Sequence, residues 1–235
     1  AQVTHTYESI NIAKLDRIFK VFKREQVTEI TLLGKITKEL VYAHRELPDL
    51  RVLKIFSRIK NFSDDTLTLA LVEELAAEGI TVLDQTELLR PLMPAAGVLT
   101  NRKPTEAELA DMRFGLNMAK KIGGLDIGQT VVVKNRAIMA VEAIEGTDAC
   151  IRRGGQLGRG GVTVAKSAKP KQDMRFDVPG VGPDTLDSMI EAGAVALVIE
   201  AGKTLVVDRE TMVAKADQHG ITIVAMAGDE AGAYA

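Results

Sequence analysis

Three acidic side chains lie close together in the sequence at Glu142, Glu145 and Asp148. They follow an apolar run and flank Gly146, which places them at the end of an expected strand. Hard cations such as Mg²⁺ take oxygen ligands and keep several waters, so these carboxylates form a candidate magnesium site. The alternative is structural, with Asp148 capping the helix that holds Cys150.

A second candidate segment, residues 168–182, combines cations with one carboxylate. Lys169, Lys171 and Arg175 precede Asp177, and prolines and glycines fix an irregular backbone path around them. Such groups suit phosphoryl or nucleotidyl transfer, because cations stabilise charge on phosphoryl oxygens while a carboxylate holds a metal or orients a water. A solvated loop with local ion pairs is the bland alternative.

Two glycine-containing segments are weaker candidates for phosphate contacts than the two segments above. Arg152 and Arg153 precede the glycine-rich residues 154–161, which predict a loop that either presents amides to a diphosphate or is simply mobile. Its glycine spacing fits neither a dinucleotide-binding loop nor a P-loop. Residues 202–204 resemble the end of a P-loop, but Leu197 stands where that motif needs glycine, so we expect a hairpin turn between two strands.

The elements that must position these groups alternate between helix and strand. In the first part of the chain, apolar spacing predicts an amphipathic helix around residues 15–22, a strand at 30–33, a helix from 63 or 64 to 79 and a strand at 80–83. Short apolar strands separated by helices indicate a parallel sheet covered by helices.

The second part has more hairpins. Thr105 and Glu108 fit a capping box that opens a helix ending near residues 123–124, and a hairpin should turn at Asn135. Further strands are expected at 162–165 and 221–225, and helices at 185–192 and 210–218. Prolines and glycine in residues 91–104 mark a boundary, so we predict an α/β fold of two domains, 1–95 and 96–235, with a Rossmann-like parallel sheet first and a mixed sheet second.

Composition narrows the function. Thirty basic and 32 acidic residues give a net charge of −2, which argues against nucleic acid as a partner. Cys150 is the one cysteine and the three histidines have no metal-ligand spacing, so neither a disulfide nor a structural zinc site is expected. No apolar run reaches the roughly 20 residues that cross a bilayer and no signal peptide opens the chain, so we expect a cytoplasmic protein.

Long strings in the second part resemble the LpxI family of UDP-2,3-diacylglucosamine pyrophosphatases. Ordered strings are more specific than a short catalytic motif. The similarity weakens before Pro104, where it rests on element order, the helix start at residues 64–65, and Gly34 after a strand. The matching strings are residues 125–129, 140–143, 145–149, 152–153, 168–172, 175–179 and 205–210.

The resemblance implies a magnesium-dependent hydrolysis in lipid A biosynthesis. Water is added across the diphosphate of UDP-2,3-diacylglucosamine, giving UMP and 2,3-diacylglucosamine 1-phosphate (lipid X). Asp177 matches the essential aspartate of the family and is the expected catalytic residue and metal ligand. The resemblance further implies metal ligation by Glu142, Glu145 and Asp148, and substrate contacts by Lys169, Lys171, Arg175, Thr147 and Arg152.

Other expectations follow from the same resemblance. Family members begin with a strand and a glycine-rich loop, whereas this sequence starts at Ala1 and soon enters its first helix, so we expect the first domain to lack that strand and loop. An acylated substrate implies an apolar cleft and peripheral contact with the inner face of the inner membrane. The resemblance leaves open whether the protein forms a homo-oligomer. The alternatives are a non-catalytic binder of nucleotide sugars or acyl lipids and, with less support, a protein scaffold.

Overall fold

The chain packs as two units, which are described one at a time. The computed structural model describes residues 4–34, 47–59, 64–170, 173 and 175–228. The first unit comprises Ala1–Gln85 and Arg175–Asp177, and the second comprises Thr86–Met174 and Val178–Ala235. The segment around Phe176 goes with the first unit because this ring is buried in that unit's core. Division by packing therefore differs from the single boundary expected between residues 95 and 96.

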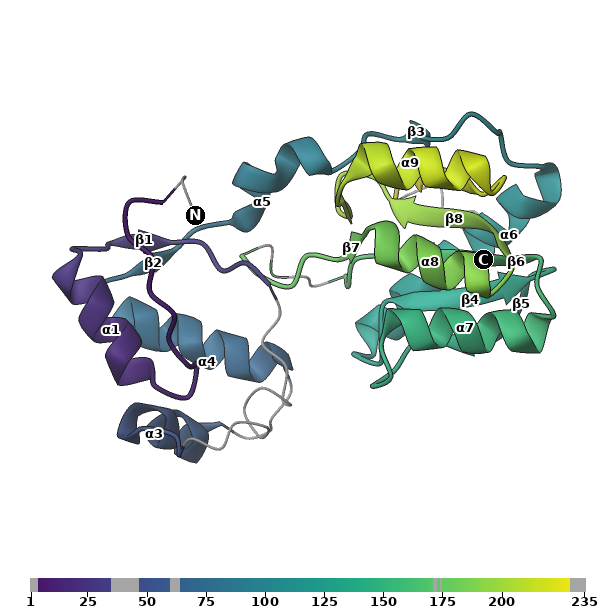
Figure 1. Cartoon of the computed structure of the whole chain (residues 1–235). Coiled ribbons are helices and arrows are strands. Elements are labelled where there is room, and N and C mark those ends of the chain that lie inside the picture. The colour runs from purple at the N-terminus through teal and green to yellow at the C-terminus, as the bar shows by residue number, and fades with distance from the viewer. Residues whose placement is uncertain (1–3, 35–46, 60–63, 171–172, 174, 229–235) are drawn as a thin grey trace. The chain divides into compact units, whose positions relative to one another are not determined.

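The first unit is a small α/β layer (Figure 1). Its two short strands pair in parallel, as the sequence predicts, although each is shorter than expected. The apolar faces of its helices meet in one core that contains Leu15, Phe19, Ile55 and Leu75. The elements are α1 (Leu15–Arg24), β1 (Glu29–Ile30), α3 (Leu50–Arg58), α4 (Asp64–Ala77) and β2 (Thr81–Val82).

A six-stranded mixed sheet organises the second unit. Its strand order is β3-β10-β8-β6-β4-β5, in which β6, β8 and β10 run parallel and the others are antiparallel to their neighbours. The strands are β3 (Gly97–Val98), β4 (Thr130–Lys134), β5 (Ala137–Val141), β6 (Val162–Lys166), β8 (Ala194–Glu200) and β10 (Thr222–Met226), and β7 (Gly180–Val181) pairs in parallel with β9 (Leu205–Val206) outside this sheet.

Helices cover both faces of this sheet (Figure 1). Alternate residues of β8 point to opposite faces, so Leu197 and Ile199 join one core while Ala196 and Val198 join the other. Helix α6 packs on the second of these faces, and α7, α8 and α9 pack on the first. The bounds are α5 (Gln85–Leu89), a 3₁₀ turn (Arg90–Leu92), α6 (Glu106–Gly124), α7 (Thr147–Gly158), α8 (Pro183–Glu191) and α9 (Arg209–Gln218).

Local signals read from the sequence are confirmed at α6 and the following hairpin. Thr105 and Glu108 form the capping box, in which each side chain accepts a hydrogen bond from the other residue's backbone amide. The turn between β4 and β5 falls at Asn135 and Arg136, both with positive φ. Asp111 stabilises this turn because its carboxylate accepts both turn amides, at 2.9 Å and 2.6 Å.

Two expectations are wrong. The glycine-rich residues 154–161 do not form a loop, because residues up to Gly158 belong to α7. A Cβ on Gly154 would lie 2.5 Å from Val132 Cβ, so glycine here permits close packing of the helix on the sheet. Residues 202–204 do not turn a hairpin either, since β8 and β9 pair with different partners.

The described part of the chain contains no helix long and apolar enough to cross a membrane.

Gly155 tests the close packing of α7. In Gly155→Ala the new Cβ would lie 2.4 Å from the carbonyl oxygen of Ala192, so the backbone must shift. We expect the free energy of unfolding, measured in urea, to fall by about 1–3 kcal/mol.

Gly124→Ala is the matched control for this added methyl group. Its nearest neighbour, Pro170 Cγ, would lie at 3.7 Å, which is ordinary contact. Because alanine favours helix, this variant should keep or raise stability. Equal losses in the two variants would contradict the packing account.

Candidate functional site

An apolar pocket of about 300 Å³ opens within the first unit. Helices α1 and α4 and the segment that follows β1 form its walls, and aliphatic and aromatic side chains dominate its surface. The wall includes Leu15, Phe19, Ile30, Leu71 and Phe176. Such a lining is suited to a hydrocarbon group.

Asp177 is the one acidic residue among the described residues that line this pocket. Its backbone has φ of 57°, in the left-handed region that non-glycine residues rarely adopt, although aspartate tolerates it better than most. The preceding residue, Phe176, is only 6% exposed, so burial of its ring fixes the segment in the first unit. The structure thus holds the expected catalytic aspartate in an uncommon conformation, as functional residues often are.

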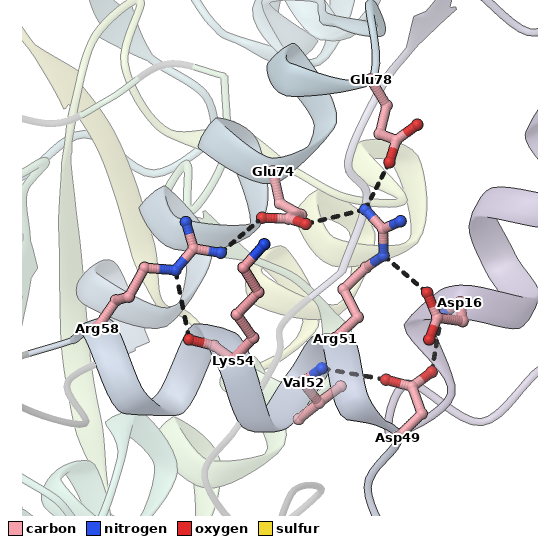
Figure 2. Close-up of polar contacts among 8 residues, drawn as sticks. All are labelled: Asp16, Asp49, Arg51, Val52, Lys54, Arg58, Glu74 and Glu78. Atoms are coloured by element: carbon pink, nitrogen blue, oxygen red, sulfur yellow. Dashed lines mark hydrogen bonds and ion pairs between the residues drawn. The ribbon is translucent and has the colours of Figure 1, made fainter.

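Arg51 of α3 ties together the helices that form the pocket walls (Figure 2). Its guanidinium bonds Asp16 of α1 at 2.9 Å, and Glu74 of α4 and Glu78 just after α4, each at 2.8 Å. It also lies 4.3 Å from the ring centroid of Phe19, a wall residue. Hydrogen bonding by Asp16 and charge from the glutamates raise the pKa of Arg51, so this tie stays charged.

The second unit connects several of the predicted polar residues. Thr147 Oγ1 donates to Glu142 Oε1 at 2.9 Å and accepts from Lys166 Nζ, also at 2.9 Å. Glu142 Oε2 accepts from the Gln129 amide at 3.2 Å. Gly128 permits this approach, because a Cβ there would lie 2.2 Å from the Glu142 carbonyl oxygen. Thr147 therefore links Glu142 to Lys166, a residue that sequence reasoning missed.

A polar cavity of about 530 Å³ lies beside this chain of hydrogen bonds. Lys166, Thr147 and Asp148 line it, together with the start of α8. Gly146 and Gly182 are the N-cap residues of α7 and α8, and neither glycine has a side chain to cap the first amides. Lys166 and the helix N-termini attract an anion, whereas the acidic residues Glu145, Asp148 and Asp184 in the same lining attract a cation, so the lining by itself does not select a phosphate over a cation.

The remaining predicted residues have separate surroundings. Glu145 also lines the polar cavity, and the hydrogen bonds that it accepts from its own backbone amide and from Arg153 lower its pKa. Lys169 forms an ion pair with Asp126 at 2.8 Å, and Arg152 pairs with Glu191 at 2.5 Å between α7 and α8. The guanidinium of Arg175 is 5.9 Å from the Phe176 ring centroid, in the first unit. Lys171 lies outside the described residues.

The expected magnesium ligands do not form a ready-made cage. Among the residues that the structure describes, no group of three or more histidine, cysteine or acidic side chains could hold a metal ion. Glu142 and Glu145 already accept hydrogen bonds from Thr147 and Arg153. Magnesium commonly binds through one or two carboxylates together with substrate phosphates, so Asp177 fits this ion only as part of a complex with a phosphorylated ligand.

Cys150 is fully buried in the core beneath α7. Burial, with the nearby charge of Glu142, raises the pKa of its thiol to about 12. The thiolate is the nucleophilic form, so this cysteine contributes to packing and does not act as a nucleophile at neutral pH.

The chain thus combines two α/β units, one with a largely apolar pocket that Asp177 helps to line and one with a cavity lined by Lys166 and several acidic residues. The chain belongs to the LpxI family. The model of the LpxI N-terminal domain matches residues 1–92, and that of the LpxI C-terminal domain matches residues 95–224. The family resemblance seen in the sequence is thus confirmed.

One curated relative is itself a member of this family, and another is a purine biosynthesis protein. The UDP-2,3-diacylglucosamine pyrophosphatase LpxI of Caulobacter vibrioides is 34% identical over 227 residues, covering 92% of this chain and 80% of that protein. The bifunctional purine biosynthesis protein PurH of Rhizobium rhizogenes is 25% identical over 228 residues, covering 92% of this chain but 38% of its own length.

Arg51→Met tests the tie between the pocket helices. The variant removes three ion pairs and the contact with Phe19 while keeping much of the side-chain volume. We expect the free energy of unfolding of the first unit, followed by circular dichroism in urea, to fall by about 1–3 kcal/mol.

Arg58→Met provides the control, because Arg58 bonds the same Glu74 at 3.1 Å but its side chain is 55% exposed. An exposed pair contributes little, so the loss should stay within about 0.5 kcal/mol. If both variants lose the same stability, Arg51 has no special role in joining the helices.

Proposed function

We propose that this chain hydrolyses the diphosphate of UDP-2,3-diacylglucosamine to UMP and 2,3-diacylglucosamine 1-phosphate, a step of lipid A biosynthesis. Family membership and the name of the Caulobacter relative support this substrate. The reaction is a hydrolysis of a phosphoric anhydride, so the protein must hold an acylated sugar, accommodate a diphosphate and direct a water molecule.

The observation that carries the proposal is the position of Asp177 in the lining of a largely apolar pocket. An acyl chain gains free energy by leaving water for a surface such as that formed by Phe19 and Leu71, roughly 25 cal/mol per Å² of apolar area buried. A nucleotide sugar without acyl chains has no group that needs this surface. Asp177 would then act close to the acylated half of the substrate.

Asp177 is the proposed catalytic residue. The oxygen of a water attacks one phosphorus, the bond from that phosphorus to the bridging oxygen breaks, and the bridging oxygen leaves on the other phosphate. The attacking water loses a proton, which a carboxylate can accept or orient. Held by Phe176 in a fixed backbone conformation, Asp177 would meet the water with little reorganisation.

The second unit offers contacts for the charged part of the substrate. Lys166 and the amides at the starts of α7 and α8 surround the polar cavity and would bind phosphate oxygens. Thr147 and Asp148 line the same cavity, and Lys169, Lys171, Arg175 and Arg152 are proposed as further substrate contacts. Asp177 would hold magnesium, and this ion would neutralise charge on the phosphoryl oxygens.

Peripheral association with a membrane belongs to the same proposal. A diacylated substrate resides in a bilayer, and a protein that takes it from there works at the membrane surface. The acyl chains are held by the apolar pocket of the first unit in this view. Vesicles that contain the substrate should therefore bind the protein better than vesicles that lack it.

Asp177→Asn tests the catalytic role while keeping the backbone, since asparagine also tolerates the left-handed region. With magnesium present, release of UMP from UDP-2,3-diacylglucosamine should slow by about 10²–10⁴ in kcat with KM changed only a few-fold.

Asp187→Asn is the control for loss of one aspartate charge, because Asp187 lies on α8 and pairs with Lys215 at the surface. It should keep the activity of the unmodified chain. No release of UMP from the unmodified chain, with tight binding of the substrate, would instead favour a non-catalytic lipid or nucleotide-sugar binder.

Magnesium binding should depend on a diphosphate. Because the described carboxylates form no cage, magnesium alone should leave the melting temperature unchanged, whereas magnesium with UDP should raise it more than UDP alone. A rise with magnesium alone would show a protein site that is complete without substrate and would contradict this account.

A further inference from the structure

A buried ionic cluster lies at the carboxyl end of β8, outside the groups discussed so far. Glu200, the last residue of that strand, has a side chain only 2% exposed. Its Oε1 lies 3.2 Å from Lys120 Nζ and 3.0 Å from Lys203 Nζ, and its Oε2 accepts from Ser167 Oγ at 2.8 Å. One buried carboxylate thus organises two ammonium groups.

The surroundings are shaped to hold these groups close together. Lys120 Nζ also donates to the carbonyl oxygen of Gly228 at 2.7 Å. A Cβ on Gly228 would lie 2.7 Å from Lys120 Nζ and 2.8 Å from Glu200 Oε1, so a larger residue here would displace one of these two charged groups. Lys120 comes from α6, Glu200 from β8 and Gly228 from the residues after β10, so three separate segments meet at this point.

The charge on the carboxylate is maintained despite burial. Burial alone would raise the pKa of Glu200, but the hydrogen bond from Ser167 and the ammonium groups of Lys203 and Lys120 outweigh it and keep the pKa below its usual value. With two ammonium groups on one carboxylate, the cluster carries one excess positive charge.

Lys203 presents this excess charge to solvent. Its side chain is 56% exposed, and its ion pair among the described residues is with Glu200. An ammonium has three N–H donors, so donors remain for a ligand. Parallel strands β6, β8 and β10 all end at this edge of the sheet, and ligands of open α/β sheets bind outside the carboxyl ends of such strands.

We propose that Glu200 is a positioning residue that holds Lys203 and Lys120 as a cationic subsite for a phosphate group. Lys203 contacts a phosphate oxygen directly, and the less exposed Lys120 adds a second positive charge nearby. The identity of this phosphate as part of the diphosphate of UDP-2,3-diacylglucosamine, or of one of its products, rests on the proposed function. The subsite itself does not, because any phosphate compound can report it.

Lys203→Met is the first test, since the exposed end of this side chain can be changed without opening the core. We expect KM for UDP-2,3-diacylglucosamine to rise about tenfold or more with kcat within about threefold, because the lost contact is made in both bound and reacting states. Lys203→Arg keeps the charge and should recover most of the affinity. Lys215→Met is the control, because Lys215 of α9 pairs with Asp187 of α8 at the surface. This variant should leave KM and kcat unchanged.

Glu200→Gln tests the positioning role. It keeps the shape but removes the charge that orders the two lysines, so KM should rise while Lys203 is still present. Circular dichroism and a melting curve show whether each variant is folded. If Glu200→Gln does not fold, the Lys203 pair of variants decides the proposal.

Calorimetric titration with inorganic pyrophosphate and with UMP separates this proposal from the proposed function. Weaker binding of either compound to Lys203→Met than to the Lys215→Met control supports the subsite even if no hydrolysis is found. Unchanged KM and unchanged binding in a folded Lys203→Met variant overturn it, even where the unmodified chain hydrolyses the substrate normally. Failure of the unmodified chain to bind either compound also overturns it.

Discussion

The parallel alignment of β6, β8 and β10 is the constraint on which the second unit depends. Parallel strands end at the same edge of a sheet, so residues that are distant in sequence, such as Lys166 and Glu200, are brought to one edge. Polar residues at those ends need not disturb the core, because apolar residues fill the strands themselves. In this unit the polar residues proposed for function therefore lie at the strand ends, and the apolar residues that stabilise the fold lie within the strands.

The first unit solves a different problem, because it maintains an opening in a small core. A pocket lined by apolar side chains tends to collapse unless its walls are held by other forces. Arg51 supplies such a force through the charged contacts shown in Figure 2. Its guanidinium lies over the Phe19 ring, and Arg51 is not one of the residues that line the pocket. Rigidity comes from ion pairs on the outside of α1, α3 and α4, and apolar surface is left for a ligand.

Much of the fold could be predicted from sequence, because its signals are local. The capping box at Thr105 and the turn at Asn135 depend on residues within a few positions, and helical periodicity identified α1 and α4. The helical state of Gly154 could not be predicted, since glycine is a weak helix former and only contact with Val132 explains its presence. Pairing of β9 with β7 instead of β8 is equally non-local.

The candidate site was predictable in part for the same reason. The charged strings around Glu142 and Asp177 were visible in the sequence. Nothing in them showed that Lys166 would donate a hydrogen bond to Thr147 or that Glu200 would form ion pairs with two lysines. Those contacts arise from strand ends that meet only in the folded sheet. Inspection of the polar residues at the ends of all expected parallel strands would have found Lys166 and Glu200.

The route of the chain through residues 175–177 has a consequence for how the protein is divided into independent parts. These residues lie deep in the second half of the sequence, yet their packing belongs with the first unit. A fragment ending at Gln85 would have a gap in its core where the ring of Phe176 sits, and it would lack Asp177. If relatives exchanged only one half of the gene, the pocket of the first unit would come from one protein and residues 175–177, which complete it, from the other.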